Sequence, residues 1–339
     1  MKPVAGLRQL LAHVIDYAGL FPPANLSLDM AIRNYARYRT DAEAWMLGRF
    51  VLPAARLGEL ASYAALFAEG PPFAFSALGR GGDSTSAFLG SLRDDLRAIA
   101  AFHKTHSSRV AVDVLEVKWP NVLAAERMSL FESVAWCIEQ HDEPLTPYFE
   151  LPLGGNWRDA MTAFVIDLKH FREDGAFRKR TKCRPPGLKL RCGGLDAATF
   201  PSPEQVAAVL HTCIAHRVPL KCTAGLHHPL RHHDDGVRTK MHGFVNVFGA
   251  GVLGQVFGLD EAHLKEIIED EDATHFVSDK HGFAWRDWHA TAAEAAFARH
   301  AAVVSFGSCS FDEPRDDLRA LGWLPEKGGS QTHDIGGEG

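Results

Sequence analysis

The sequence predicts a single (β/α)8 barrel, and two patterns support this fold class. From Leu47 onward, short strand-like runs alternate with helix-length apolar stripes, which is typical of a parallel sheet covered by helices. Several strands also carry charged residues at alternate positions, whereas strands of an open doubly wound sheet are buried on both faces and are continuously apolar. Because no glycine-rich fingerprint follows the first strand, the closed barrel is favoured over the open sheet.

The elements are expected in the following order. A helix over residues 6–17 and a second over 28–40, capped by Ser27, form a helical extension over residues 1–45. The barrel covers residues 46–326, and a glycine-rich polar tail over 327–339 is expected to be disordered. Expected strands lie at 49–53, 73–78, 109–118, 147–152, 187–192, 219–224 and 303–311.

One strand of the eight is ambiguous. Residues 275–278 and 283–285 flank Asp279-Lys280-His281-Gly282, which predicts a hairpin turn. Either arm could complete the barrel, or the hairpin could be an appendage, and the sequence leaves both alternatives open.

Composition restricts the class of protein. The chain has 339 residues, a net charge of −6, 46% hydrophobic and 23% charged residues, so no nucleic-acid or acidic-membrane partner is expected. No apolar run approaches the roughly 18 residues of a membrane span, and the N-terminus lacks the apolar core of a signal peptide. Six scattered cysteines without a CxxC pair predict reduced thiols in a cytoplasmic protein. A homo-oligomer is possible, and the sequence does not determine the oligomeric state.

The strongest functional signal is a β-α-β unit over residues 187–231. In its first strand Leu188 and Leu190 alternate with Lys189 and Arg191, and its second strand carries Lys221. Successive side chains of a strand face opposite sides, so the cations point into the barrel if the apolar residues pack on helices. A buried cation costs several kcal/mol unless it is paired or serves a ligand, and two adjacent strands with this feature indicate a reaction centre.

Neighbouring strands add further inward candidates. Lys221 is the candidate nucleophile or general base, because a nearby lysine and burial both lower a lysine pKa. Lys189 is a further catalytic candidate that, with Arg191, is expected to hold the anion, and Glu116 and Glu150 are candidate proton carriers. The residues expected to hold an anionic substrate are Arg191, Lys118, Arg80, Ser308 and Ser310.

Two short segments resemble deoxyribose-phosphate aldolases. Lys221-Cys222-Thr223-Ala224-Gly225 is similar to their Lys-x-Ser/Thr-x-Gly strand, and Gly307-Ser308-Cys309-Ser310 resembles their glycine- and serine-rich phosphate end. The resemblance implies a Schiff-base lysine at Lys221 and does not extend to the rest of the chain.

The loop after Lys221 is rich in histidine. It runs His227-His228-Pro229-Leu230-Arg231-His232-His233-Asp234-Asp235. His227 and His228 are candidate acid–base residues, and neutral imidazole also suits Zn, Mn, Fe or Ni. The spacing matches no known metal site, and the first strand has no His-x-His, so we assign no metal ligand and no cofactor.

Three functional hypotheses follow from these residues. The first is an aldolase-like lyase, isomerase or hydro-lyase that acts on a small anionic carbonyl or hydroxy-acid substrate through a barrel lysine. The second is a metal-dependent hydrolase or lyase that uses the histidine-rich loop with Glu116 or Glu150. The third is a barrel that binds a ligand without chemistry, whose charges would all be mutually paired.

Overall fold

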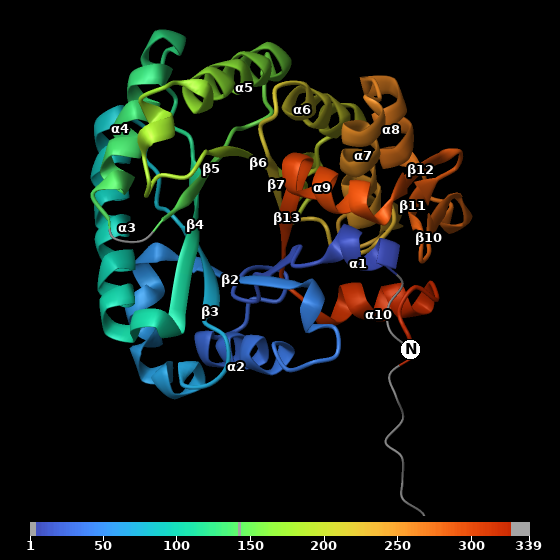
Figure 1. Cartoon of the computed structure of the whole chain (residues 1–339), viewed down its shortest axis with the longest axis horizontal. Helices are drawn as coiled ribbons and strands as arrows, with labels where there is room; N and C mark the ends of the chain where they lie inside the picture. The colour runs from blue at the N-terminus through green and yellow to red at the C-terminus, as the bar shows by residue number, and fades with distance from the viewer. Residues whose placement is uncertain (1–4, 142–143, 327–339) are drawn as a thin grey trace, which may run out of the picture.

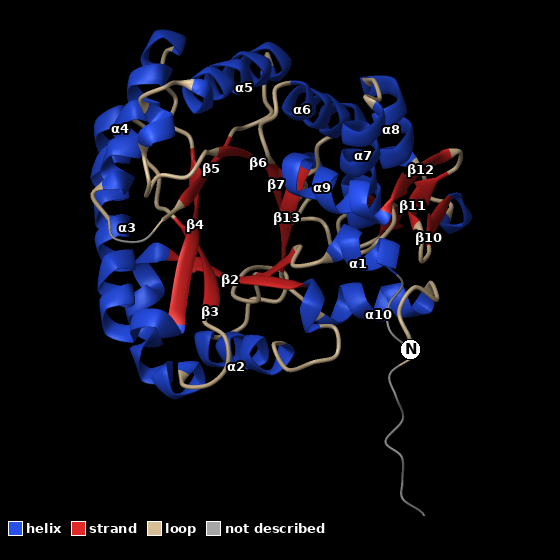
Figure 2. Ribbon diagram, viewed as in Figure 1, coloured by secondary structure: helices blue, strands red, loops and turns tan. Residues whose placement is uncertain are grey.

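A closed barrel of eight parallel strands forms the centre of the molecule, with helices around it (Figures 1 and 2). The structure is a computed structural model that describes residues 5–141 and 144–326. The predicted (β/α)8 fold is confirmed. The tail over residues 327–339 lies outside the described residues.

The barrel strands run in sequence order around the ring, and β13 closes it between β7 and β1. Every strand except β1 overlaps a strand that the sequence predicts. The strands are β1 (Ile15–Tyr17), β2 (Leu47–Pro53), β3 (Phe73–Leu78), β4 (Val110–Lys118), β5 (Thr146–Glu150), β6 (Gly187–Arg191), β7 (Leu220–Thr223) and β13 (Val303–Ser308).

β1 lies where the sequence predicts the end of a helix. The first helix, α1 (Ala5–Leu11), is shorter than expected, and the chain changes direction at His13, whose φ of 56° is left-handed. β1 then pairs with β2 and β13, with Asp16 opposite Gly307. The prediction that residues 1–45 form only a helical extension is therefore wrong, because this segment supplies a barrel strand.

A helix follows each barrel strand and covers the outside of the ring (Figure 2). Ser27 caps the first of them, as expected, by accepting a hydrogen bond from Met30 N. These helices are α2 (Leu28–Tyr38), the 3-10 helix η2 (Ala54–Phe67), α3 (Thr85–His106), α4 (Arg127–Glu139), α5 (Trp157–Glu173), α6 (Pro203–Ala215), α7 (Phe244–Phe257) and α10 (Asp312–Ala320).

A long insertion separates β7 from β13. It contains a hairpin of β8 (His232–Asp234) and β9 (Thr239–Met241), then α7, α8 (Glu261–Glu269), a three-stranded antiparallel sheet and α9 (Ala292–Ala302). The three strands are β10 (Phe276–Ser278), β11 (Gly282–Trp285) and β12 (Trp288–Thr291). They lie beside α7 and α8 at the right of Figure 1, outside the barrel.

The ambiguous strand is thus resolved. β10 and β11 form the predicted antiparallel hairpin, with Ser278 opposite Phe283, and neither arm enters the barrel. The hairpin is an appendage against which α1 and α9 pack.

The apolar core lies between the strands and the helices. Phe75 of β3 packs edge-on against Phe67 and Phe102, and Phe149 of β5 packs against Phe131. Burial of each such ring contributes about 1.5–3 kcal/mol. This layer stabilises the strands from outside and leaves the barrel interior for polar groups.

No helix of the described part of the chain has both the length and the apolarity needed to cross a membrane. All six cysteines are buried and free, as the sequence predicts. The cytoplasmic location and the oligomeric state stay predictions.

Candidate active site

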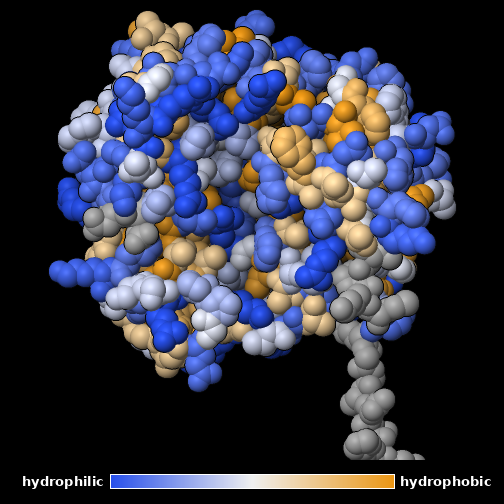
Figure 3. Space-filling view, viewed as in Figure 1, coloured by the Kyte–Doolittle hydropathy of each residue, from blue (hydrophilic) through white to orange (hydrophobic). Residues whose placement is uncertain are grey.

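A cavity of about 360 Å³ opens where the barrel strands end, and we call it the barrel-mouth cavity. Figure 3 looks toward the centre of the barrel, and hydrophilic residues border the hollow there. Active sites of (β/α)8 enzymes lie at this carboxyl end. The polar side chains that line the cavity are Glu116, Lys118, Glu150, Lys189, Arg191, Thr223, His227 and Cys309.

Lys189 occupies the floor of the barrel-mouth cavity between two carboxylates. Its Nζ lies 3.0 Å from Glu116 and 2.9 Å from Glu150, and the residue is 7% exposed. Burial alone lowers the lysine pKa, but the two carboxylates outweigh it and raise the pKa above its usual value. Lys189 is therefore an ammonium group at neutral pH, in contact with the cavity and with the half-buried Glu150.

Lys221 lies next to Lys189 in the strand register but deeper in the barrel. Its Nζ is paired with Asp16, lies 3.0 Å from Ser305 Oγ and 3.4 Å from Glu116. The side chain is 1% exposed and is not among the residues that line the barrel-mouth cavity. The two lysines thus share Glu116, but only Lys189 faces the cavity, so the expectation that the cations of both strands point into one cavity is wrong for Lys221.

The expected lowering of the lysine pKa is wrong for both residues. Burial lowers the pKa of Lys221, but Asp16 and Glu116 outweigh burial and raise it. Two neighbouring cations are visible in the sequence of β6 and β7, but the carboxylate of Asp16 comes from β1, which was not predicted as a strand. Asp16, Glu116 and Glu150 together give three carboxylates against two ammonium groups, so attraction exceeds the repulsion between the lysines.

Glu116 is held as a carboxylate. Burial raises its pKa, but Lys221, Lys189 and a 2.6 Å hydrogen bond from Ser76 lower it to about 2. A carboxylate with this pKa holds the two ammonium groups in place and does not donate a proton at neutral pH. The proposed role of proton carrier therefore fits Glu150 better than Glu116.

A second ion pair lies beneath this cluster and was not predicted. The guanidinium of Arg49 donates to both oxygens of Asp113 at 2.6 and 2.7 Å, and the Arg49 backbone N–H donates to Asp16 at 2.6 Å. The alternation of side chains along β4 did not predict an inward Asp113, because the register between β3 and β4 shifts there. Phe75 lies opposite Val112, and Ser76 lies opposite Val114. A shift of one residue moves side chains to the other face.

Two cations at the rim of the barrel-mouth cavity have no carboxylate partner among residues 5–141 and 144–326. Lys118 ends β4 and Arg191 ends β6, and both are exposed and line the cavity. Neither side chain makes an ion pair or hydrogen bond with the described residues that line or surround the cavity. Since every other cation of the cluster has a carboxylate within reach, these two are free to bind an anion.

Three other predicted substrate-binding residues lie elsewhere. Arg80 donates to Asp95 at 2.9 Å and borders a neighbouring pocket. Ser308 Oγ accepts a hydrogen bond from the Ser310 backbone, and Ser310 Oγ accepts one from Glu313 N at the start of α10. The structure therefore does not bring Arg80, Ser308 and Ser310 into the barrel-mouth cavity.

Cys309 faces the cavity in place of the two serines. Its Sγ lies 3.7 Å from His227 Nδ1, which is also 3.4 Å from Glu313 Oε2. Burial lowers the pKa of His227, but its contacts with Cys309 and Glu313 raise it to about 9. His227 was predicted from the sequence, whereas Cys309 was not; its place between Ser308 and Ser310 was its signal in the sequence.

His228 points away from the barrel-mouth cavity. Its Nδ1 lies 2.6 Å from Asp317 of α10, and it does not line the cavity. The chain turns between β7 and this segment at Ala224 and Gly225, whose φ values of 56° and 69° are left-handed. A Cβ on Gly225 would lie 2.8 Å from Cys192 O, so glycine is required where the loop passes the end of β6.

Comparisons with known proteins leave the function to be inferred from the site. No protein-family model matches the chain, and a search of curated proteins finds no similar sequence.

Proposed function

We propose that the protein is an enzyme of lyase or isomerase type that acts on a small anionic carbonyl or hydroxy-acid compound in the barrel-mouth cavity. One observation carries this proposal. Lys118 and Arg191, whose side chains have no carboxylate partner in the described part of the chain, line the same cavity as the Lys189–Glu150 pair. An anion-binding rim and a proton-transfer pair therefore lie within the reach of one small molecule.

The proposed chemistry is proton transfer next to a carbonyl group. Arg191 and Lys118 hold the carboxylate or phosphate of the substrate by charge-assisted hydrogen bonds. The Glu150 carboxylate takes the proton from the neighbouring carbon, and the C–H electron pair forms the C=C bond of an enolate. The Lys189 ammonium stabilises the negative charge that develops on the carbonyl oxygen. In a substrate with a hydroxyl group on the deprotonated carbon, the hydroxyl proton moves to the former carbonyl oxygen. Return of the carbon-bound proton from Glu150 to the former carbonyl carbon then forms the new C=O bond at the neighbouring position and completes an isomerisation.

Lys221 has a supporting role in this proposal. It is buried under the cavity and paired with Asp16, and its raised pKa opposes the neutral amine that a Schiff base requires. Lys221 orients Glu116, and Glu116 in turn holds Lys189 beneath the substrate. The buried ion pair of Lys221 and the exposure of Lys189 to the cavity therefore favour the electrostatic use of a barrel lysine over a covalent one.

The hypothesis of a barrel that binds a ligand without catalysis is disfavoured by Lys118 and Arg191 at the rim of the cavity. A barrel that had lost its reaction would show charges that are all mutually paired, whereas Lys118 and Arg191 face the cavity without carboxylate partners among the described residues that surround it. The metal-dependent alternative would use His228, His232 and Asp234, which approach one another outside the barrel-mouth cavity.

Exchange of carbon-bound hydrogen for deuterium tests the proposal. The wild-type protein is incubated in D2O with a panel of small oxo-acids, hydroxy-acids and sugar phosphates, and loss of the proton signal is followed by NMR. At least one compound should exchange faster with protein than without it. Glu150→Gln should lower the rate by about 10²–10⁴-fold, as removal of a general base does.

A matched control separates this effect from a general loss of charge. Glu173 ends α5 and is exposed, so Glu173→Gln should exchange the same compound at the wild-type rate. Exchange that is unchanged in Glu150→Gln would remove Glu150 as the base. A panel that binds but never exchanges would favour the non-catalytic barrel.

A further inference from the structure

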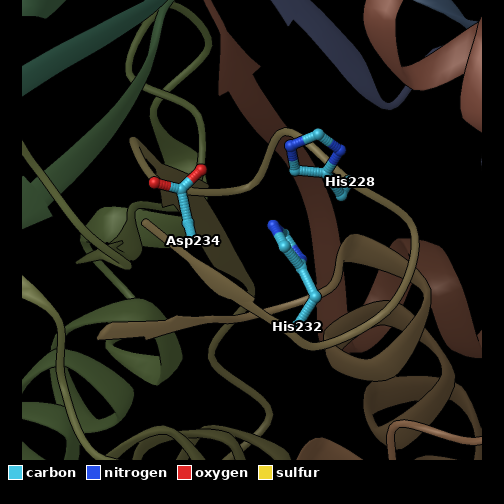
Figure 4. A group of neighbouring side chains, drawn as sticks. All are labelled: His228, His232 and Asp234. Carbon is cyan, nitrogen blue, oxygen red and sulfur yellow. The ribbon is translucent and has the colours of Figure 1, made fainter. Parts of the chain in front are cut away.

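Three side chains outside the barrel-mouth cavity approach one another closely. The potential metal-binding atoms of His228, His232 and Asp234 all lie within 4.8 Å of each other, and Figure 4 shows the three side chains grouped together. His232 and Asp234 are alternate residues of β8 and so share one face of the strand. His228 comes from the loop that leads from β7 to the hairpin.

The hydrogen bonds of the two imidazoles leave one nitrogen of each ring for a ligand. His228 Nδ1 lies 2.6 Å from Asp317 Oδ2, and His232 Nδ1 lies 3.0 Å from the Leu230 carbonyl oxygen. When Nδ1 donates its proton, Nε2 keeps a lone pair. Metal-binding histidines almost always make this hydrogen bond to a carboxylate or a backbone carbonyl.

The Nε2 atom of His232 gives the second, independent observation. It is shielded from solvent and has no hydrogen-bond partner among the described residues. A buried polar atom without a partner destabilises the folded protein. A metal ion in front of His232 would remove this destabilisation.

The carboxylates complete the set of ligands. Asp234 Oδ1 accepts a hydrogen bond from Val237 N at 3.0 Å, and its other oxygen is available. Glu313 Oε1 lies 3.9 Å from His228 Nε2. Two imidazoles and one or two carboxylates suit a four-coordinate divalent ion, either with four protein ligands or with water in the fourth position.

We propose that His228, His232 and Asp234 bind a divalent transition-metal ion, of which Zn²⁺ is the best match. Imidazole with carboxylate favours Zn²⁺ over Mg²⁺ and Ca²⁺, which prefer oxygen ligands alone. The ion fastens the β8–β9 hairpin to the loop after β7 and, through Asp317, to α10. His227 of that loop lines the barrel-mouth cavity, so the ion fixes part of its wall.

Calorimetric titration of Zn²⁺ into the full-length protein, purified without a histidine tag and stripped with a chelator, tests the site. The wild-type protein should bind one equivalent. His232→Ala and Asp234→Asn should each weaken binding by more than a hundredfold. Asp317→Asn removes only the partner of His228 and should weaken binding by about 10–100-fold.

His233 provides the matched control. It lies on β8 between the two ligands, has a side chain that is 55% exposed, and contacts Asp235 instead. His233→Ala should bind Zn²⁺ like the wild type. Equal Zn²⁺ binding by the wild type, His232→Ala and Asp234→Asn would overturn the proposal. The heat of binding would then come from other histidines among the 18 of the chain.

Co²⁺ provides a second measurement that does not depend on one variant folding normally. Visible absorption of Co²⁺ bound to the wild type should indicate four-coordinate nitrogen and oxygen ligation, and Zn²⁺ should displace it. Absence of a stoichiometric Zn²⁺ complex with the wild type would also overturn the proposal. The inference is independent of the anion site, and either can fail alone.

Discussion

Replacement of Lys221 by methionine tests the buried ion pair at the centre of the barrel. Methionine keeps most of the length of the side chain and removes the charge. The Asp16 carboxylate, which is fully buried, then loses its closest cation, and Glu116 loses one at 3.4 Å. Asp16 keeps the Arg49 backbone N–H at 2.6 Å and the Arg49 guanidinium at 3.9 Å.

The magnitude follows from these distances. Two unit charges about 4 Å apart interact by roughly 4 kcal/mol at an effective dielectric constant near 20, and breaking a buried pair costs about 3–5 kcal/mol. The remaining contacts of Asp16 with Arg49 reduce the loss, whereas the weaker pairing of Glu116 adds to it. Lys221→Met should therefore lower the free energy of unfolding by about 3–5 kcal/mol.

Urea unfolding at pH 7 measures this loss as a shift of the midpoint at constant slope. Lys104→Met, on the exposed side of α3, is the control and should change stability by less than about 0.5 kcal/mol. Asp16→Asn combined with Lys221→Met should cost less than the sum of the single changes, because the double variant leaves no unpaired charge. A loss below about 1 kcal/mol in Lys221→Met would refute the buried pair.

Two further predictions concern pH and covalent chemistry. Burial lowers the pKa of His242 to about 4, so the unfolded chain binds a proton below about pH 6.5 and the folded protein does not. The contribution of neutral His242 to the free energy of unfolding is therefore complete above pH 6.5 and falls by up to about 3 kcal/mol toward pH 4. The midpoint of urea unfolding should depend less on pH in His242→Gln than in the wild type. Borohydride treatment with the panel of oxo-acids should give no adduct at Lys221, which is 1% exposed; mass-spectrometric detection of one would restore the Schiff-base mechanism.

The strands that carry alternating charges were predictable because their signal is local. Lys189 and Arg191 follow the two-residue period of β6, and Glu116 and Lys118 follow that of β4. The structure places all four in the barrel-mouth cavity. Within each of these runs the two-residue period is uninterrupted, so successive side chains face opposite sides and the sequence alone gives their direction.

Asp16 could not be predicted in the same way. Its strand has three residues and follows a helical pattern of leucines, so no local period identifies it. Only its pairing with β2 and β13, which lie far away in the sequence, makes it a strand. Because Asp16 reverses the direction of the Lys221 pKa shift, this long-range pairing also decided the interpretation of the lysine.

Calorimetric titration of citrate and phosphate into the protein tests the anion-binding rim most directly. The wild type should bind at least one of the two, and Arg191→Gln and Lys118→Gln should each weaken binding by about 10–100-fold, the loss of one charge-assisted hydrogen bond. Arg178→Gln, at an exposed site outside the barrel, should bind like the wild type. Anion binding that is unchanged in the Arg191→Gln and Lys118→Gln double variant would contradict the proposal that these cations hold the substrate.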